Sequence, residues 1–276
     1  MPKNLNTKTT LIIIGYGNMA KAIAIALDKN GKYTLEVCGR DFTKAQDFIR
    51  QNGLKNAATL ESKTQKTQNN KLDSMININV QDKIVLLCVK PYGLGSFSYE
   101  GKAKAVYSTL AGVNIATLQS HIKATYFARL MPNIGARYGL SATAVFLSSV
   151  SKDSKQEAQE IIESFGDAVF VNGENLIDSA IATSGSSPAF IALIAQSLID
   201  AGVQEGLSRT DSLELVRQTF KGFARLFECA TPQEIIEAVT TPAGTTAQGL
   251  AVLEKKAIRG AFLQACKASV KKARQK

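Results

Sequence analysis

The fold of this chain is decided by Leu11-Ile12-Ile13-Ile14-Gly15-Tyr16-Gly17-Asn18-Met19-Ala20, close to its first residue. Four consecutive apolar residues predict a short buried strand, and apolar side chains then recur at helical spacing. Gly15 allows a tight turn, Gly17 lets a ligand approach the backbone, and Ala20 allows helix and strand to pack closely. This context predicts a dinucleotide-binding turn, whose expected cofactor-binding residues are Gly15, Gly17, Asn18, Met19 and Ala20.

Strand and helix patterns alternate over the first 171 residues. Besides 11–14, we predict strands at residues 33–38, 84–89, 103–108, 125–131, 142–147 and 168–171. Helical spacing predicts helices at residues 19–29, 44–51 and 152–165. The alternation indicates an α/β fold with an N-terminal Rossmann-type, doubly wound sheet at residues 1–171. The polar segment 61–79 does not fit this pattern, and we expect a long loop or a frayed helix there.

Strand signals disappear after residue 171, and the remainder predicts an all-helical C-terminal domain at residues 172–276. The expected helices cover residues 188–206, 209–227, 232–239, 246–254 and 258–272. The first of them is apolar nearly all round, and Ser187 and Pro188 fit its start. Because such a helix needs burial on most sides, we expect a homodimer or a larger homo-oligomer, with a self-contained helical bundle as the alternative.

The end of the second strand, Gly39-Arg40-Asp41, bears on the choice of cofactor. Enzymes that use NAD place an acidic residue there to hold the ribose hydroxyls. Gly39 leaves room for a phosphate and Arg40 can bind it through two hydrogen bonds, which favours NADPH, with NADH as the alternative. Asp41 either caps the following helix or faces the ribose.

Two other strands end in residues that can reach a ligand. Lys90 and Pro91 follow the strand 84–89, and Asn133 follows the strand 125–131. Ligands of doubly wound sheets bind outside the carboxyl ends of the strands. We therefore predict Lys90, Pro91 and Asn133 as cofactor-binding residues, although either ending can also be structural.

Two turns in the second half are rich in small residues and hydroxyls. The turn Thr241–Thr246 feeds a helix whose first N–H groups point outward and can hold a carboxylate. Its hydroxyls can meet a substrate nitrogen. The run Ser184–Pro188 reads as a helix-capping turn, and Ser184 could in addition line a substrate pocket.

Composition excludes several functions. A single histidine and scattered cysteines make a catalytic metal site improbable, so we expect no metal. The net charge of +10 falls largely on the C-terminal helix without interleaved aromatic residues, so we expect no nucleic-acid partner. We find no apolar run long enough to span a bilayer and no signal-peptide region, and predict a cytoplasmic protein without a membrane partner.

The motifs occur in an order that resembles the pyrroline-5-carboxylate reductase family. The resemblance rests on residues 11–20, 89–91, 131–133, 184–189 and 239–253. It implies reduction of 1-pyrroline-5-carboxylate to L-proline with NADPH or NADH, the last step of proline biosynthesis. It also implies that Thr246 contacts the substrate nitrogen as the catalytic residue, and that the backbone of Gly244, Thr245 and Thr246 holds the substrate carboxylate.

The chain departs from the family pattern in three places. Ser187 replaces a glycine, Ala243 stands where a second glycine is common, and the segment 61–79 is longer than usual. None of these departures removes a proposed chemical group.

Two rival functions stay open at this stage. One is another NADP-dependent reductase or dehydrogenase of the same two-domain plan, such as a hydroxy-acid dehydrogenase, for which Lys221 would be the candidate lysine. The other is a non-catalytic nucleotide-binding or nucleic-acid-binding protein, which only the positive charge supports.

Overall fold

The computed structural model describes residues 8–60, 63–65 and 75–275 and divides into two compact units. The first unit comprises the chain up to Gly185 together with the C-terminal segment from Val270, and the second comprises Ser186–Ser269. The domain boundary predicted between residues 171 and 172 falls directly after the last strand of the first unit, and it stays a prediction.

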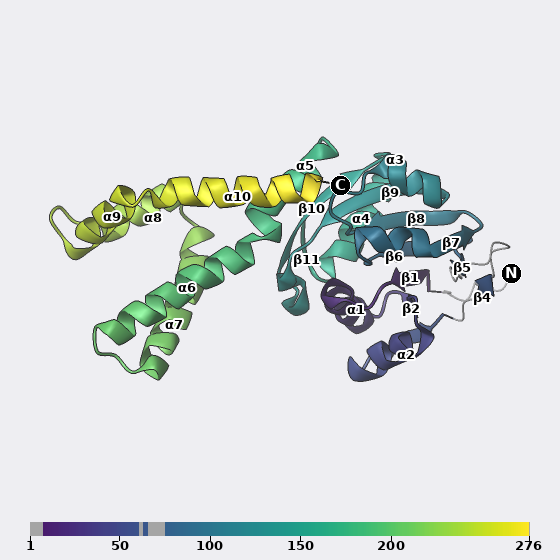
Figure 1. The fold of residues 1–276 in the computed structure, drawn as a ribbon, viewed down its shortest axis with the longest axis horizontal. Coiled ribbons are helices and arrows are strands. Elements are labelled where there is room, and N and C mark those ends of the chain that lie inside the picture. Colours follow the sequence, from purple (N-terminus) through teal and green to yellow (C-terminus); the bar gives the residue numbers. More distant parts are fainter. Residues whose placement is uncertain (1–7, 61–62, 66–74, 276) are drawn as a thin grey trace, which may run out of the picture. The chain divides into compact units, whose positions relative to one another are not determined.

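The first unit is built on one eight-stranded sheet in the order β11-β10-β9-β8-β6-β1-β2-β3 (Figure 1). The strands are β1 (Thr10–Ile14), β2 (Thr34–Cys38), β3 (Ala57–Thr59), β6 (Ile84–Leu87), β8 (Ala103–Ser108), β9 (Ala124–Met131), β10 (Ser141–Leu147) and β11 (Gly166–Phe170). Neighbouring strands are parallel from β3 to β9, whereas β10 runs antiparallel to β9. This arrangement confirms the predicted α/β fold with a Rossmann-type sheet.

A second, three-stranded sheet corrects the expectation for residues 61–79. It consists of β4 (Lys63–Gln65), β5 (Met75–Asn79) and β7 (Phe97–Glu100), in the order β4-β5-β7. Ile76 and Ile78 of β5 are buried in the same cluster as Phe97. The end of the segment is therefore a strand rather than a loop or helix, while residues 61–62 and 66–74 lie outside the described part.

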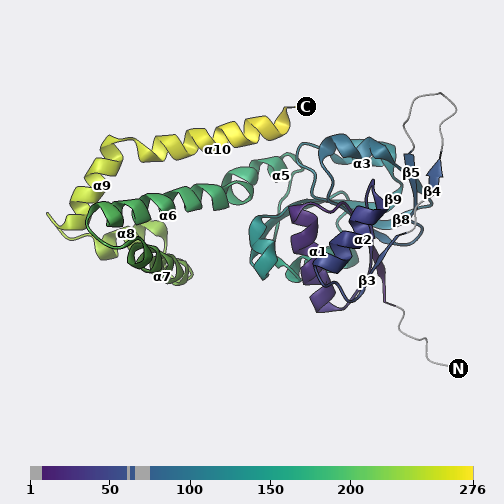
Figure 2. The same ribbon diagram turned by 60° about the horizontal axis from the view of Figure 1, so that its bottom comes forward.

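Helices cover both faces of the large sheet (Figure 2). The first unit contains α1 (Asn18–Asn30), α2 (Phe42–Gln51), α3 (Ile115–His121), α4 (Lys152–Glu163), α5 (Asn175–Ser179), the 3-10 helices η1 (Pro91–Ser96) and η2 (Ile134–Tyr138) and the π-turn η3 (Ile181–Gly185). Because side chains alternate along a strand, Leu11 and Ile13 of β1 face α1, α2 and α4, whereas Ile12 and Ile14 face α3 and the small sheet. This burial on both faces explains why the central strands are almost wholly apolar.

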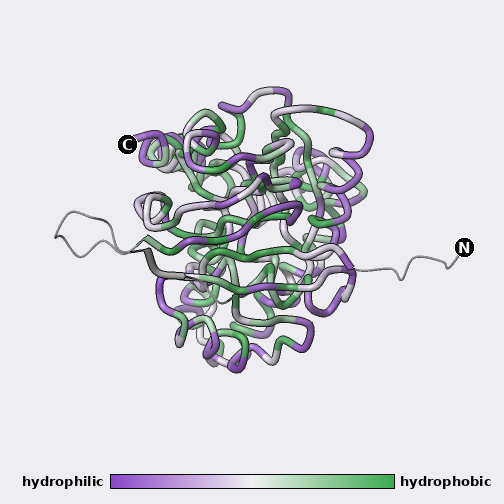
Figure 3. Tube along the Cα trace, turned by 90° about the vertical axis from the view of Figure 1, so that its right-hand side faces the viewer, coloured by the Kyte–Doolittle hydropathy of each residue, from purple (hydrophilic) through white to green (hydrophobic). Residues whose placement is uncertain are grey.

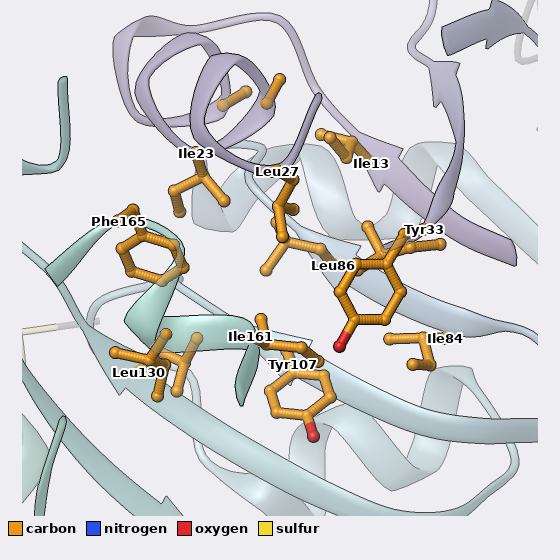
Figure 4. Packing of buried hydrophobic residues seen from close by; sticks show 14 of the residues in the cluster. Ile13, Ile23, Leu27, Tyr33, Ile84, Leu86, Tyr107, Leu130, Ile161 and Phe165 are labelled. Atoms are coloured by element: carbon orange, nitrogen blue, oxygen red, sulfur yellow. The ribbon is translucent and has the colours of Figure 1, made fainter. Parts of the chain in front are cut away.

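The core between the sheet and α1 and α4 is close-packed. Figure 4 shows Ile13 and Leu86 of the sheet next to Leu27 of α1, with Ile23 of the same helix nearby, and all four are buried. In Figure 3 the strands of this unit run largely in the green of apolar residues. The core fixes the strand ends from which the candidate site is built.

The last turns of the chain are tied to the first unit. The guanidinium of Arg274 donates to the Ser179 hydroxyl at 2.8 Å and to the Asn175 carbonyl at 3.3 Å. A side chain at Gly112 would lie 2.3 Å from the carbonyl oxygen of Ala273, so a glycine is needed where the two segments meet.

The second unit is all helical, as predicted. It contains α6 (Ser187–Gln204), α7 (Arg209–Phe227), α8 (Pro232–Val239), α9 (Thr245–Lys255) and most of α10 (Ile258–Arg274). Helices α6 and α7 meet at Gly202, where an added Cβ would lie 2.5 Å from the Ser212 hydroxyl. In α6–α9 as described, only Ile199 and Ser212 are buried, so a single copy leaves the unit without a closed core.

The start of α6 differs from the predicted cap. Ser186 rather than Ser187 holds the N-cap position, its backbone is helical, and it makes no side-chain cap hydrogen bond. The reason is that η3 and α5 continue the helical segment back to Asn175. The resulting 30-residue segment, Asn175–Gln204, is long and apolar enough to cross a bilayer by length and composition, which corrects the statement that no such run exists. A core helix can pass the same test, so this is weak evidence for a membrane span.

Candidate functional site

The first glycine of the turn after β1 is fixed by backbone geometry. Gly15 has φ +121°, a conformation that disfavours other residues, and an added Cβ would lie 2.8 Å from the Cys88 carbonyl. Its N–H donates to the Cys38 carbonyl at 2.8 Å. Gly15 therefore holds the ends of β1, β2 and β6 together.

The second glycine leaves the start of α1 open. Gly17 is the N-cap of α1 and supplies no side-chain cap hydrogen bond, and among the residues that the structure describes no atom lies within 4 Å of an added Cβ. Asn18 is exposed, whereas Ala20 is fully buried against the sheet. Uncapped N–H groups at the positive end of a helix fit the pyrophosphate of a dinucleotide.

The parallel strands bring several loops to one edge. Ile14 pairs in register with Leu87, Leu87 with Ser108, and Ser108 with Arg129, so these strands end side by side. The loop after β6 carries exposed Lys90, with Pro91 as the first residue of η1.

The loop after β8 also lies at this edge of the sheet, and we did not predict it from the sequence as part of the site. The Thr109 hydroxyl donates to the Leu87 carbonyl at 3.1 Å and so ties the loop to β6. Burial raises the pKa of the neighbouring Cys88 thiol to about 12, which keeps it protonated. Lys90 and Asn133 were predicted because ligands of doubly wound sheets bind outside the carboxyl ends of the strands. Thr109 follows the predicted strand 103–108, so the same reasoning indicates Thr109 as well.

The structure joins two predicted residues, Asn133 and Ser184. The Asn133 side-chain oxygen accepts from the Gly135 N–H at 2.9 Å, and its amide donates to the Ser184 hydroxyl at 3.4 Å. Ser184 in turn donates to the Ala142 carbonyl of β10. The two side chains form one polar cluster beside the sheet edge.

The end of β2 resolves the role of Asp41. Its carboxylate accepts from the Lys44 N–H at 3.1 Å and caps α2, while Arg40 is exposed beside it. The space over Gly39 holds the ring of Tyr16, whose Cε1 would lie 2.1 Å from an added Cβ. Gly39 therefore makes room for an aromatic ring, and the expectation that it also leaves room for a phosphate stays a prediction.

The predicted substrate turn lies in the second unit. The Gly244 N–H donates to the Thr241 carbonyl at 3.0 Å, and an added Cβ at Gly244 would lie 2.3 Å from the Thr241 hydroxyl. Ala243 adopts φ +57°, which explains why a glycine suits that position. Gly244 is the N-cap of α9 and provides no side-chain cap, which leaves the N–H groups of Thr245 and Thr246 at an open helix start.

The remaining candidates give no second site. Lys221, the lysine of the rival dehydrogenase reading, is exposed on α7. Within the described residues there is no group of three or more histidine, cysteine or acidic residues that could hold a metal ion.

The fold and the glycine turn define a Rossmann-type protein with a helical second unit. Two family models match the chain: one described as NADP oxidoreductase, coenzyme F420-dependent, at residues 10–112, and one described as pyrroline-5-carboxylate reductase dimerisation at residues 174–276. A pyrroline-5-carboxylate reductase of Helicobacter pylori is 44% identical over 266 residues, which are 96% of this chain and 98% of the relative. The chain belongs to the pyrroline-5-carboxylate reductase family.

Solved structures agree with this assignment. The 1-pyrroline-5-carboxylate reductase of Streptococcus pyogenes has a TM-score of 0.80 at 26% identity, covering 97% of this chain and 98% of that one. The pyrroline carboxylate reductase of Plasmodium falciparum, solved with NADP bound, has a TM-score of 0.72 at 25% identity and covers 97% and 98%. The predicted family and fold class are therefore confirmed.

Proposed function

We propose that this chain reduces 1-pyrroline-5-carboxylate to L-proline with NADPH, with NADH as the poorer donor. The observation that carries the proposal is the presence of two open helix starts. One follows the Gly15–Gly17 turn and the other follows the Thr241–Gly244 turn, and neither has a side-chain cap. The pyrophosphate of a dinucleotide and a small carboxylate can each bind at such a helix start. Membership of the reductase family supports a reaction in which the dinucleotide and the small carboxylate take part together.

The residues of the first unit fit a nicotinamide dinucleotide. Gly17 and the first turn of α1 would hold the pyrophosphate, since no atom of the described residues lies within 4 Å of a Cβ added at Gly17. Exposed Arg40 would bind the 2′-phosphate, because Asp41 is engaged as a helix cap. Lys90, Pro91 and Asn133 would line the edge where the nicotinamide lies. When bound, the cofactor supplies a hydride for C5 of the cyclic imine.

Thr246 and its neighbours would orient the substrate. The N–H groups of Thr245 and Thr246, with Gly244 as the turn that exposes them, would hold the carboxylate. The Thr246 hydroxyl would hydrogen-bond the imine nitrogen, which takes a proton that comes ultimately from solvent while C5 accepts the hydride, so that the C=N bond becomes a C–N bond. Holding donor and acceptor in place would supply most of the rate enhancement.

A homodimer accounts for the exposed apolar surface of the second unit. Large apolar side chains on α6 and α7 are about half exposed in the single chain, namely Ile191, Leu193, Leu198, Leu215, Phe223, Leu226 and Phe227. Exposed surface of this kind marks an interface. The match to a dimerisation model at residues 174–276 supports a second copy as the occupant. We infer that the paired helices also complete the substrate site.

The test is to add 1-pyrroline-5-carboxylate to the protein with NADPH and follow cofactor oxidation and proline formation. Parallel assays use NADH and short hydroxy acids as the substrates of the rival dehydrogenase reading. Turnover of the pyrroline with NADPH supports the proposal. Turnover of a hydroxy acid alone, or of no substrate, would overturn it.

A further inference from the structure

The contact between Tyr16 and Gly39 carries an inference about cofactor selection. Tyr16 stands between the two glycines of the turn, and Gly39 follows β2 about 20 residues further on. In this fold that second position is where an acidic side chain holds the ribose hydroxyls of NAD. The two residues therefore meet where the adenosine ribose would bind.

The Tyr16 ring fills the space of a residue-39 side chain. A Cβ at position 39 would lie 2.1 Å from Cε1, 2.7 Å from Cδ1 and 3.1 Å from Cζ of the ring. Real Cβ atoms do not approach other atoms so closely, so any side chain at position 39 must displace the ring. The ring in its present position leaves no room for a carboxylate side chain at residue 39.

The backbone gives no other reason for the glycine. Gly39 is absent from the residues with positive φ, so its conformation is open to other amino acids. What keeps it a glycine is the contact with Tyr16.

The other acidic residue nearby is already engaged. The Asp41 carboxylate accepts from the Lys44 N–H at 3.1 Å and lies 3.7 Å from the Lys44 ammonium. Arg40, between Gly39 and Asp41, is exposed. The end of β2 thus presents an aromatic ring and a guanidinium rather than a free carboxylate, and a guanidinium suits a phosphate.

We propose that Tyr16, seated on Gly39, is a specificity-determining residue that selects NADPH by occupying the space from which an acidic side chain would bind the ribose of NADH. This inference rests on the proposed function, because it concerns the cofactor of that reaction. It makes cofactor choice a property of a residue pair. Replacement of Gly39 alone cannot convert the site to NADH.

The experiment measures kcat/KM with NADPH and NADH for the wild type, Tyr16→Gly, Gly39→Asp and the double variant. We expect Gly39→Asp to weaken both cofactors, because the carboxylate repels the phosphate and the displaced ring crowds the ribose. The double variant should use NADH at least about tenfold better than Gly39→Asp, as expected for residues in contact. If Gly39→Asp alone used NADH as well as the double variant does, the proposal would be overturned.

Tyr16→Phe is the matched control. It keeps the ring and removes only the hydroxyl, so the wild-type preference between NADPH and NADH should persist. A loss of that preference would assign selectivity to the hydroxyl and contradict the steric role of the ring.

Two measurements without turnover separate this inference from the proposed function. Thermal unfolding of the cofactor-free protein should show that Gly39→Ala is destabilising and that adding Tyr16→Gly relieves much of the loss. Additive losses in the double variant would contradict the contact.

Calorimetry that compares the binding of 2′,5′-ADP with that of 5′-ADP tests selectivity directly. Preferential binding of 2′,5′-ADP by the wild type, together with tighter binding of 5′-ADP by Tyr16→Gly/Gly39→Asp than by Gly39→Asp, would support the inference even if pyrroline-5-carboxylate were not reduced. If pyrroline-5-carboxylate is reduced but the double variant keeps the wild-type preference, the inference alone fails.

Discussion

The Asn133 side-chain amide lies 3.4 Å from the Ser184 hydroxyl, and these two residues come from segments 51 positions apart. A hydroxyl has one hydrogen, and that of Ser184 is directed at the Ala142 carbonyl. Towards any ligand, Ser184 can therefore only accept a hydrogen bond. If it lines the substrate pocket, it faces a donor group and not the substrate carboxylate.

The first prediction concerns this pair. We expect Asn133→Ala and Ser184→Ala each to lower the free energy of unfolding by about 1 kcal/mol, and the double variant to lose less than the sum. Chemical denaturation of the four proteins measures the coupling. Ser120→Ala, which removes a hydroxyl from the exposed end of α3, is the control and should change stability by less than about 0.5 kcal/mol. Fully additive losses would mean that the two side chains do not interact.

Thr246 is the residue on which the proposed chemistry depends most. Thr246→Ala should lower kcat by roughly tenfold to a thousandfold, by analogy with the loss of one oxyanion-hole donor. Thr246→Ser retains the hydroxyl and should keep most of the rate. Steady-state kinetics with 1-pyrroline-5-carboxylate measure both, and unchanged kcat and KM in Thr246→Ala would exclude the assigned role.

The alanine in the substrate turn should be mildly strained. Ala243 has φ +57°, and a left-handed backbone costs a residue with a Cβ about 1 kcal/mol. Ala243→Gly should therefore raise the free energy of unfolding by up to that amount, in thermal or denaturant unfolding. Ala247→Gly, inside helix α9, is the matched control and should lower it by about 0.5–1 kcal/mol. A destabilised Ala243→Gly variant would contradict this description of the turn.

A buried ion pair joins β9 to α5 near the site edge. The Arg129 guanidinium lies 2.8 Å from the Asp178 carboxylate, and their side chains are 3% and 10% exposed. Arg129→Met should cost about 3–5 kcal/mol, because it leaves Asp178 buried without its partner.

The exposed pair of Arg209 and Asp200, 3.2 Å apart, provides the control. Arg209→Met should cost less than about 1 kcal/mol in the same denaturation assay, because solvent screens exposed charges. If both variants lost the same free energy of unfolding, burial would not explain the cost of breaking the Arg129–Asp178 pair.

Much of this structure could be predicted from local pattern. The helices at residues 209–227 and 232–239 and the strand at 103–108 have the predicted bounds, because their periodicity and caps are local signals. Gly15 and Gly17 also lie in the turn between β1 and α1, and Ala20 lies in the first turn of α1, as the sequence context predicts.

The missed features depend on partners distant in the sequence. Strands β3 and β4 have three residues each, too few to show a period, and they exist only through pairing with β2 and β5. The run Ser184–Pro188 was interpreted as a capping turn, whereas in the structure Ile181–Gly185 forms a π-turn packed on β9. Tyr16 was overlooked because only the folded chain brings it against Gly39.

The most direct test of the central claim is to mix the purified wild-type protein with NADPH and 1-pyrroline-5-carboxylate and to quantify both products. The account predicts one molecule of proline formed for each NADPH oxidised, and a rate that falls with Thr246→Ala. If the protein binds 2′,5′-ADP yet forms no proline from this substrate, the account of its function is contradicted.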